Sequence, residues 1–462
     1  MHLFWENMLP NLVLLWTGAF KSLDEGAGSY ELDKNVWKAI GAATAKSGST
    51  IPSAYGPWLP NIESERHLYT ADMWSFWALF LGPSLLQQKF SDIKYYNHFV
   101  ALVELLTICL QFELTQDDMM KVQLGFADWV AKYEDRYYYQ LDPERLCTCV
   151  LTIHGLLHIF DGIVALGPSW VYWAFAMERF CGRLQRNIRN RQFPCANLAT
   201  FVVADARLKQ LGLKYNITQM LSLKPPTDCP VREQVSVEGC TYGVFILNMA
   251  HTQFSLDSTC VLLPPHLPKG SVSELQLLRR IFLCLATRFN VTLSIAKRHV
   301  KADRIELFGK VRRLDGGDTM CASEMVSTSD DHRDATYIWY QILKDRNARH
   351  CNVPKVFELI SHFAQLVNII VVHLPPIINF CLDKPFTLVL AEVQTCKTDA
   401  FCNTPLGISC YQDLAPPEVI DVTCVQCLVG RLKLSDGARP IWAVIDRSGG
   451  LARAAWASKD AT

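Results

Sequence analysis

The sequence predicts an α+β protein, with an all-helical N-terminal region followed by a β-rich C-terminal region. Up to about residue 216, apolar residues recur at the three- and four-residue spacing of amphipathic helices. Beyond Pro225, Pro226 and Pro230, short alternating or apolar runs are separated by Gly, Asp and Pro clusters, which is typical of strands and turns. The chain has 462 residues, half of them hydrophobic, so it is long enough for two or three domains with buried cores.

The expected helices of the N-terminal region begin at capping residues or follow a clear apolar period. A helix over residues 33–45 would close near Gly48, and residues 51–69 form a proline-rich connection. A helix over residues 70–90 opens at the cap-like sequence that starts with Thr70. The others are expected over residues 98–114, from the cap at Thr115 to about 139, around a histidine pair, along a series of arginines, and over residues 196–211.

The C-terminal region is expected to be mainly strands, with one helix pair at its start. The pair covers residues 272–289 and 292–300. The predicted strands are residues 242–249, 304–314, 336–343, 369–373, 387–395, 419–432 and 441–446. We therefore divide the chain into a helical domain (12–222), a linker with a strand and a helical hairpin (223–300) and a β-rich domain (301–462).

Charge and cysteine usage narrow the class of protein. Lys plus Arg and Asp plus Glu both number 45, so attraction to nucleic acid would have to come from local patches. The 17 cysteines are odd in number and no secretory signal opens the chain, which favours the nucleus or cytoplasm over secretion. No run reaches the roughly 18 apolar residues of a spanning helix, so we expect no membrane partner.

A series of arginines is the best candidate for a binding surface. On a helical projection the arginines fall on roughly one side, and the apolar residues fall on the other: Met177, Phe180, Leu184 and Ile188. Each guanidinium can bind two phosphate oxygens and keeps its charge, which suits nucleic acid. The candidate residues are Arg179, Arg183, Arg186, Arg189 and Arg191. The alternative interpretation is a solvated face, or one paired with acids of neighbouring helices.

Two histidines precede the arginines and suggest a second site. His154 and His158 are four residues apart, Asp161 follows one turn later, and Cys147 and Cys149 lie just upstream. Imidazole and thiolate are zinc ligands, so Cys149, His154 and His158 form a candidate metal site. The spacing is not that of a standard finger, and we favour two hydrogen-bonded histidines beside buried cysteines.

Other motifs in the sequence indicate a function less strongly than the arginines and histidines do. The C-x-x-C of Cys424 and Cys427 has no partner pair and lies in an apolar run, so we interpret both as core cysteines. The helix pair at 272–300 carries basic residues and matches a helix-turn-helix only by its outline. We find no Gly-rich phosphate loop and no G-x-S-x-G.

At these motifs the chain resembles a known family. The matching features are H-x-x-x-H at His154, Gly167-Pro168, Trp173 followed by Met177-Glu178-Arg179, and the Arg-Asn-Arg that starts at Arg189. Together they resemble the helical domain of unknown function in CACTA-type (En/Spm-like) transposon proteins, especially those of mushroom-forming fungi. The similarity extends from residue 12 to segments near the C-terminus, including FGKVRRLDGGDT and WAVIDRSGGLARA.

The resemblance carries expectations about activity. Strand cleavage in such transposases is attributed to an upstream RNase H-like domain whose acidic triad holds two metal ions. Residues 1–11 resemble the last motif of that domain, and Glu6 would correspond to its final acidic ligand. The earlier aspartates are missing, so we expect no strand transfer by this polypeptide alone.

The resemblance also bears on partners and cofactor. It favours DNA contact by the arginines, transposase subunits as partners, and zinc at the Cys/His cluster. Plant versions carry a His-Asp-Cys-His cluster where this chain reads DMWSFW over residues 72–77, which counts against a fully ligated site.

The prediction is therefore a non-catalytic, DNA-handling accessory portion of a transposon protein. Two alternatives stay open. One is a metal-dependent hydrolase that uses Cys149, His154, His158 and Asp161. The other is a protein-interaction module.

Overall fold

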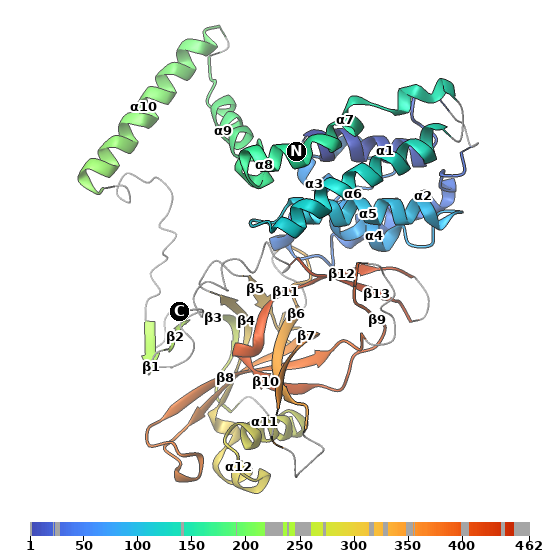
Figure 1. Cartoon of the computed structure of the whole chain (residues 1–462). Helices are drawn as coiled ribbons and strands as arrows, with labels where there is room; N and C mark the ends of the chain where they lie inside the picture. Colours follow the sequence, from blue (N-terminus) through green and yellow to red (C-terminus); the bar gives the residue numbers. More distant parts are fainter. Residues whose placement is uncertain are drawn as a thin grey trace.

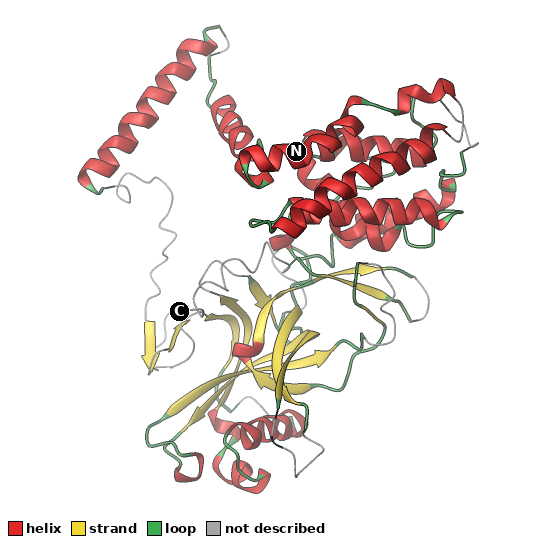
Figure 2. Cartoon of the chain, viewed as in Figure 1, coloured by secondary structure: helices red, strands yellow, loops and turns green. Residues whose placement is uncertain are grey.

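A computed structural model confirms the predicted class: the N-terminal region is helical and the C-terminal region is built on antiparallel sheets (Figures 1 and 2). The helices lie above the sheets in Figure 1, and helices α9 and α10 lead away from both as a projecting arm. The structure describes residues 2–21, 23, 28–139, 143–190, 192–217, 234–237, 240–244, 260–270, 274–313, 318–326, 331–347, 354, 356–398, 406–435 and 439–447.

The helices of the bundle form where a capping residue is followed by apolar residues at helical spacing. Asp33 caps α2 by accepting from the backbone of Asn35 and Val36, and Thr115 and Asp118 form a reciprocal capping box on α6. The helices are α1 (Leu9–Trp16), α2 (Lys34–Ser47), α3 (Ala71–Phe76), α4 (Gly82–Leu85), α5 (Ile93–Cys109), α6 (Gln116–Glu134), α7 (Leu151–His154) and α8 (Ile159–Leu166). A π-helical turn, η1 (His2–Met8), precedes α1.

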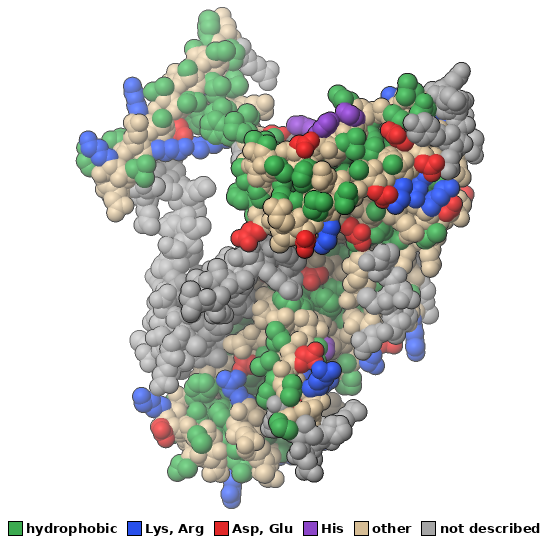
Figure 3. Space-filling model, in the orientation of Figure 1, with side chains coloured by type: hydrophobic (Ala, Val, Ile, Leu, Met, Phe, Trp, Pro, Cys, Tyr) green, Lys and Arg blue, Asp and Glu red, His purple; other side chains and the backbone are tan. Residues whose placement is uncertain are grey.

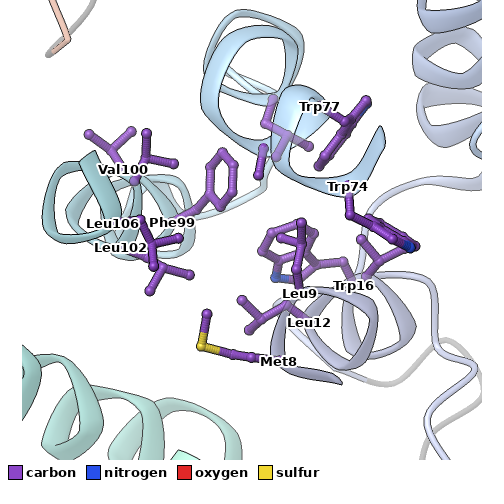
Figure 4. Packing of buried hydrophobic residues seen from close by; sticks show 14 of the residues in the cluster. Met8, Leu9, Leu12, Trp16, Trp74, Trp77, Phe99, Val100, Leu102 and Leu106 are labelled. Carbon is purple, nitrogen blue, oxygen red and sulfur yellow. The ribbon is translucent and has the colours of Figure 1, made fainter. Parts of the chain in front are cut away.

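Aromatic residues fill the bundle core. Trp16 and Trp77 are fully buried between α1, α3 and α5, and the ring of Phe99 lies close to both (Figure 4). His98 stacks on Trp129 at 4.3 Å between ring centroids, and burial lowers the pKa of His98 to about 3. This histidine therefore stays neutral and acts as a core residue.

Two predicted helices are interrupted. The single helix expected over residues 70–90 is α3, a π-helical turn (Trp77–Leu81) and α4, since Pro83 cannot donate the backbone hydrogen bond of a continuous helix. The histidine helix is likewise divided, because a 3₁₀ turn (Gly155–His158) separates α7 from α8. The sequence pattern missed α1, whose first turn tolerates Pro10.

The large sheet is organised around β7, which is 18 residues long. Along one edge β7 pairs with β6 and then β4, and along the other with β8, all antiparallel. The strands of this sheet are β1 (Gln234–Val237), β2 (Cys240–Val244), β3 (Cys260–Leu267), β4 (Ile305–Arg313), β5 (Thr319–Cys321), β6 (Tyr337–Asp345), β7 (Phe357–Leu374), β8 (Phe386–Thr395), β10 (Glu418–Asp421) and β11 (Val425–Leu428). The predicted strand at 242–249 is described only as far as residue 244.

The predicted helix pair, α11 (Leu275–Arg288) and α12 (Leu293–His299), packs on the large sheet. Leu277, Ile281 and Leu285 of α11 are buried in the same cluster as the sheet residues. Arg280 reaches the buried Glu392 of β8 at 2.5 Å. This burial packs the apolar face of α11 against the sheet.

A small three-stranded sheet joins the two regions. It consists of β9 (Cys410–Tyr411), β12 (Gly430–Lys433) and β13 (Trp442–Ile445). Leu432, Ala443 and Ile445 belong to the hydrophobic cluster of the helical bundle, so the last strands of the chain complete the core of its first helices. The helical and β-rich parts thus separate along the sequence but share a core.

Polar contacts reinforce this junction. Thr50, after α2, exchanges hydrogen bonds with the backbone of Arg431, and the Tyr55 hydroxyl donates to the carbonyl of Leu428 at 2.7 Å. The Arg431 guanidinium lies over the ring of Tyr337 at 3.6 Å and that of Trp442 at 4.5 Å. These hydrogen bonds and cation–π contacts therefore connect the small sheet to the helical bundle and to the large sheet.

Candidate nucleic-acid interface

The arginines lie on an arm that leaves the bundle after α8. Gly167, with a φ of +88°, ends α8, and Pro168 turns the chain away. At the base of the arm, the Trp170 indole donates to the carbonyl of Phe112 at 3.0 Å. The arm continues as α9 (Phe175–Arg186) and α10 (Pro194–Tyr215), which extend into solvent (Figure 1).

Three of the predicted arginines share one face of α9. Arg179, Arg183 and Arg186 follow at four and three residues, and all are exposed. The helix ends at Arg186, because the Asn187 side chain donates to the carbonyl of Arg183 and takes the place of the next helical turn. The expectation that Arg189 continues the helical face was wrong.

Arg189 lies in the connection between α9 and α10. Its backbone N–H donates to the side-chain oxygen of Asn197 at 2.8 Å, which ties this connection to α10. The Arg189 side chain is exposed. Arg191, the last arginine of the predicted set, lies outside the described residues.

Arg183 holds the two arm helices together. Its guanidinium bonds to Asp205 of α10 and lies 5.9 Å from the ring centre of Phe201. Lys209 also contacts Asp205, at 2.9 Å. The hydrogen bond from Lys209, together with the smaller effect of Arg183, holds the pKa of Asp205 below its usual value. The prediction that acids of a neighbouring helix pair with the arginines therefore applies to Arg183.

The arm as a whole is basic. Residues 167–216 contain eight Lys and Arg against Glu178 and Asp205, a net charge of +6 in a chain whose net charge is +0. Figure 3 shows Lys and Arg side chains on the arm, interleaved with hydrophobic ones. Among the described residues, no carboxylate forms an ion pair with Arg179, Arg186 or Arg189. Their charge is therefore directed to solvent.

The opposite face of the arm is apolar and exposed. Met177 is 64% exposed and Phe180 is 45% exposed, and the aliphatic residues of α10 behave alike. In a monomeric soluble domain such residues are normally turned to a core. Nothing in the described part of the chain covers them.

The histidine pair lies on the bundle surface at the base of the arm. His154 and His158 approach at 3.2 Å between their Nε2 atoms, and Nδ1 of His158 is 3.7 Å from Asp161. All three side chains are exposed. The contact between the two rings agrees with the interpretation favoured from the sequence, but Cys147 and Cys149 are half-buried rather than buried.

Cys149 does not complete a metal site with these histidines. Over the described residues, no three His, Cys, Asp or Glu side chains are arranged to hold a metal ion. Burial raises the pKa of the Cys149 thiol, which is half-buried. The geometry therefore gives zinc, and the hydrolase that would use it, no support at Cys149, His154 and His158.

Three other residues that the sequence analysis singled out are Glu6, Cys424 and Cys427, and their contacts in the structure are with neighbouring protein groups. Glu6, in η1, is exposed and accepts from Nδ1 of its neighbour His2, whose Nε2 lies 3.4 Å from Glu178 of α9. Cys424 ends a 3₁₀ turn and Cys427 lies in β11, both half-buried. Burial raises the pKa of Cys424, as expected of a core thiol.

Sequence reasoning missed a polar cluster on the large sheet. Glu306 of β4 accepts from Nε2 of His266 at 2.9 Å and from Nε2 of His373 at 3.0 Å. On the other side of the ring, Nδ1 of His373 lies 3.1 Å from the hydroxyl of Thr387, which is directly opposite on β8. These residues are far apart in sequence, so only the strand pairing could have revealed the cluster. Thr387 is buried, which favours a structural role.

Replacing Glu306 with Gln is expected to destabilise the large sheet by about 2 kcal/mol at neutral pH, since hydrogen bonds to a charged group are lost. Burial by itself raises the pKa of Glu306, but the hydrogen bonds from His373 and His266 together lower it to about 2. The wild-type contribution is thus present above the unfolded-state pKa of 4.5 and is lost as the pH falls toward 2. Urea unfolding at pH 7 and pH 3 measures this; an equal loss at both would contradict it.

No helix in the described part of the chain is by itself long and apolar enough to cross a membrane. One pair, Leu151–Leu166 with Ser169–Arg186, reaches the required length and hydropathy jointly, but it is bent by 86°.

Comparison of the chain with protein-family models, with curated proteins and with solved structures found no match. A proposal for its function therefore depends on the arm, on the charges it carries and on the motifs of the sequence.

Proposed function

We propose that this chain is the non-catalytic, DNA-handling accessory portion of a CACTA-type transposon protein that acts in the nucleus. The transposon assignment is based on the sequence motifs, and the DNA contact on the arm. The single observation that carries the DNA contact is the basic arm, with Arg179, Arg186 and Arg189 exposed and not paired with any described carboxylate.

The arm suits a phosphate backbone for three reasons. It leads away from the bundle and the sheets (Figure 1). Its guanidinium groups can each donate two hydrogen bonds to phosphate oxygens. The Arg183–Asp205 contact joins α9 to α10, which brings the basic residues of the two helices onto one arm. Contacts of this kind position a protein on DNA without reading its sequence.

The experiment replaces Arg179, Arg186 and Arg189 with Ala and titrates a fluorescent duplex. We expect weaker binding by this variant. A matched control replaces Arg279, Lys297 and Arg298, three exposed basic residues of the α11–α12 pair, with Ala. Equal loss in both variants would indicate a general charge effect and would refute the arm as the contact.

A second candidate function, a protein-interaction module, is favoured by the exposed apolar face of the arm. Met177 and Phe180 lie on α9 opposite its arginines, and DNA backbone contacts leave such residues uncovered.

Replacing Met177 and Phe180 with Ser is expected to abolish self-association or capture of transposase subunits, and to leave the duplex affinity within about twofold, since charge contacts dominate nonspecific DNA binding. Sedimentation and duplex titration of the same variant measure both. Loss of DNA binding with unchanged association would reverse the assignment of the two faces.

A further inference from the structure

A cavity of about 380 Å³ lies where distant parts of the chain meet. Its walls come from η1, from the loop before α3, from α3 and α5, from the base of the arm and from the end of β13. This volume is within the range of roughly 300–1,000 Å³ that is usual for small-molecule sites. Such sites are frequent at the junctions between structural units.

The walls of this junction cavity are mainly aromatic. Trp5, Tyr55 and Phe76 are buried side chains of the wall, and Phe80 and Trp173 are partly buried. The rings of Phe76 and Phe80 lie 5.2 Å apart. Aromatic faces carry negative potential and attract cations within about 6 Å. The walls therefore suit a flat apolar body and an adjacent positive group.

The charged groups of the junction cavity point to the same class of ligand. Two carboxylates, Asp72 and Asp446, and one guanidinium, that of Arg447, are among the lining groups. The Arg447 guanidinium already donates to the carbonyl of Tyr55 at 2.6 Å. Burial raises the pKa of Tyr55 well above its usual value, so its hydroxyl stays neutral. The excess charge of the lining is negative.

The approach to Asp72 is open. Gly56, with a φ of +133°, faces this carboxylate, and a Cβ at this position would lie 3.7 Å from Asp72 Oδ2. The Ser75 hydroxyl, which also lines the cavity, donates to the backbone carbonyl of Asp72 and not to its carboxylate. Asp72 itself is exposed at the mouth of the cavity.

From these observations we propose that the junction cavity binds a small aromatic amine, with the ring between the aromatic walls and the ammonium group at Asp72 and Asp446. This assignment is independent of the DNA proposal. It concerns a different face of the chain and uses none of the arm arginines.

Three probes of one shape test it: tryptamine (cationic), tryptophol (neutral) and indole-3-acetate (anionic), titrated calorimetrically into the full chain. We expect tryptamine to bind about tenfold more tightly than tryptophol, and indole-3-acetate to bind most weakly, since the charges oppose it. Asp72→Asn and Asp446→Asn should each reduce the preference for tryptamine. The control Asp128→Asn, at an exposed aspartate of α6, should leave it unchanged.

The variants are checked for folding by circular dichroism, and Leu79→Trp, which fills the cavity, should abolish binding of all the probes. Failure of wild-type chain to bind tryptamine overturns the proposal. So does equal affinity for the cationic and neutral probes, or an Asp72→Asn chain that keeps the full preference.

Discussion

Replacing Arg431 with Met is expected to lower the free energy of unfolding by about 3 kcal/mol, because a largely buried ion pair loses one partner. The Arg431 side chain is 14% exposed and its guanidinium bonds to Asp334 at 2.5 Å. It also donates to the Tyr411 hydroxyl at 3.2 Å. The Met variant would leave the Asp334 carboxylate partly buried and without its charge partner.

The stacking of Arg431 predicts an intermediate result for Lys. Arg431→Lys keeps a positive charge near Asp334 but cannot stack a planar group between Tyr337 and Trp442. Urea unfolding monitored by tryptophan fluorescence measures both variants, with Arg298→Met as the exposed control. An Arg431→Met chain as stable as the control would show that the junction does not depend on this residue.

The second large effect concerns the arm. Because each arginine bound to a phosphate displaces one counterion, the logarithm of DNA affinity falls with the logarithm of salt by about 0.9 per contact. Removing Arg179, Arg186 and Arg189 should therefore make that slope shallower by roughly 3. Between 50 and 200 mM salt, the wild-type chain should lose about 40-fold more affinity than the variant.

Local signals in the sequence predicted many elements correctly. Asp33 and Thr115 marked the starts of α2 and α6, since side-chain caps act over a few residues. Alternation placed β8 at nearly its observed bounds. The same reasoning could not foresee that Leu432 and Ala443 complete the helical core, because such packing joins residues hundreds of positions apart.

The candidate site was predicted in part. The arginine face of α9 follows from helical periodicity, which is a local property. Its end at Arg186 depends on the hydrogen bond from Asn187, and the pairing of Arg183 depends on where α10 lies. Neither the end of α9 nor the ion pair of Arg183 can be predicted from helical periodicity. The Glu306 cluster escaped notice because its members meet only through strand register.

The salt dependence of duplex binding tests the central claim most directly. Wild-type chain, the Arg179, Arg186 and Arg189 variant, and the variant at Arg279, Lys297 and Arg298 are titrated with one duplex at several salt concentrations. The arm hypothesis predicts a slope shallower by roughly 3 for the arm variant and an unchanged slope for the control. Equal slopes for wild-type and arm variant would contradict it, since the arginines would then release no counterions.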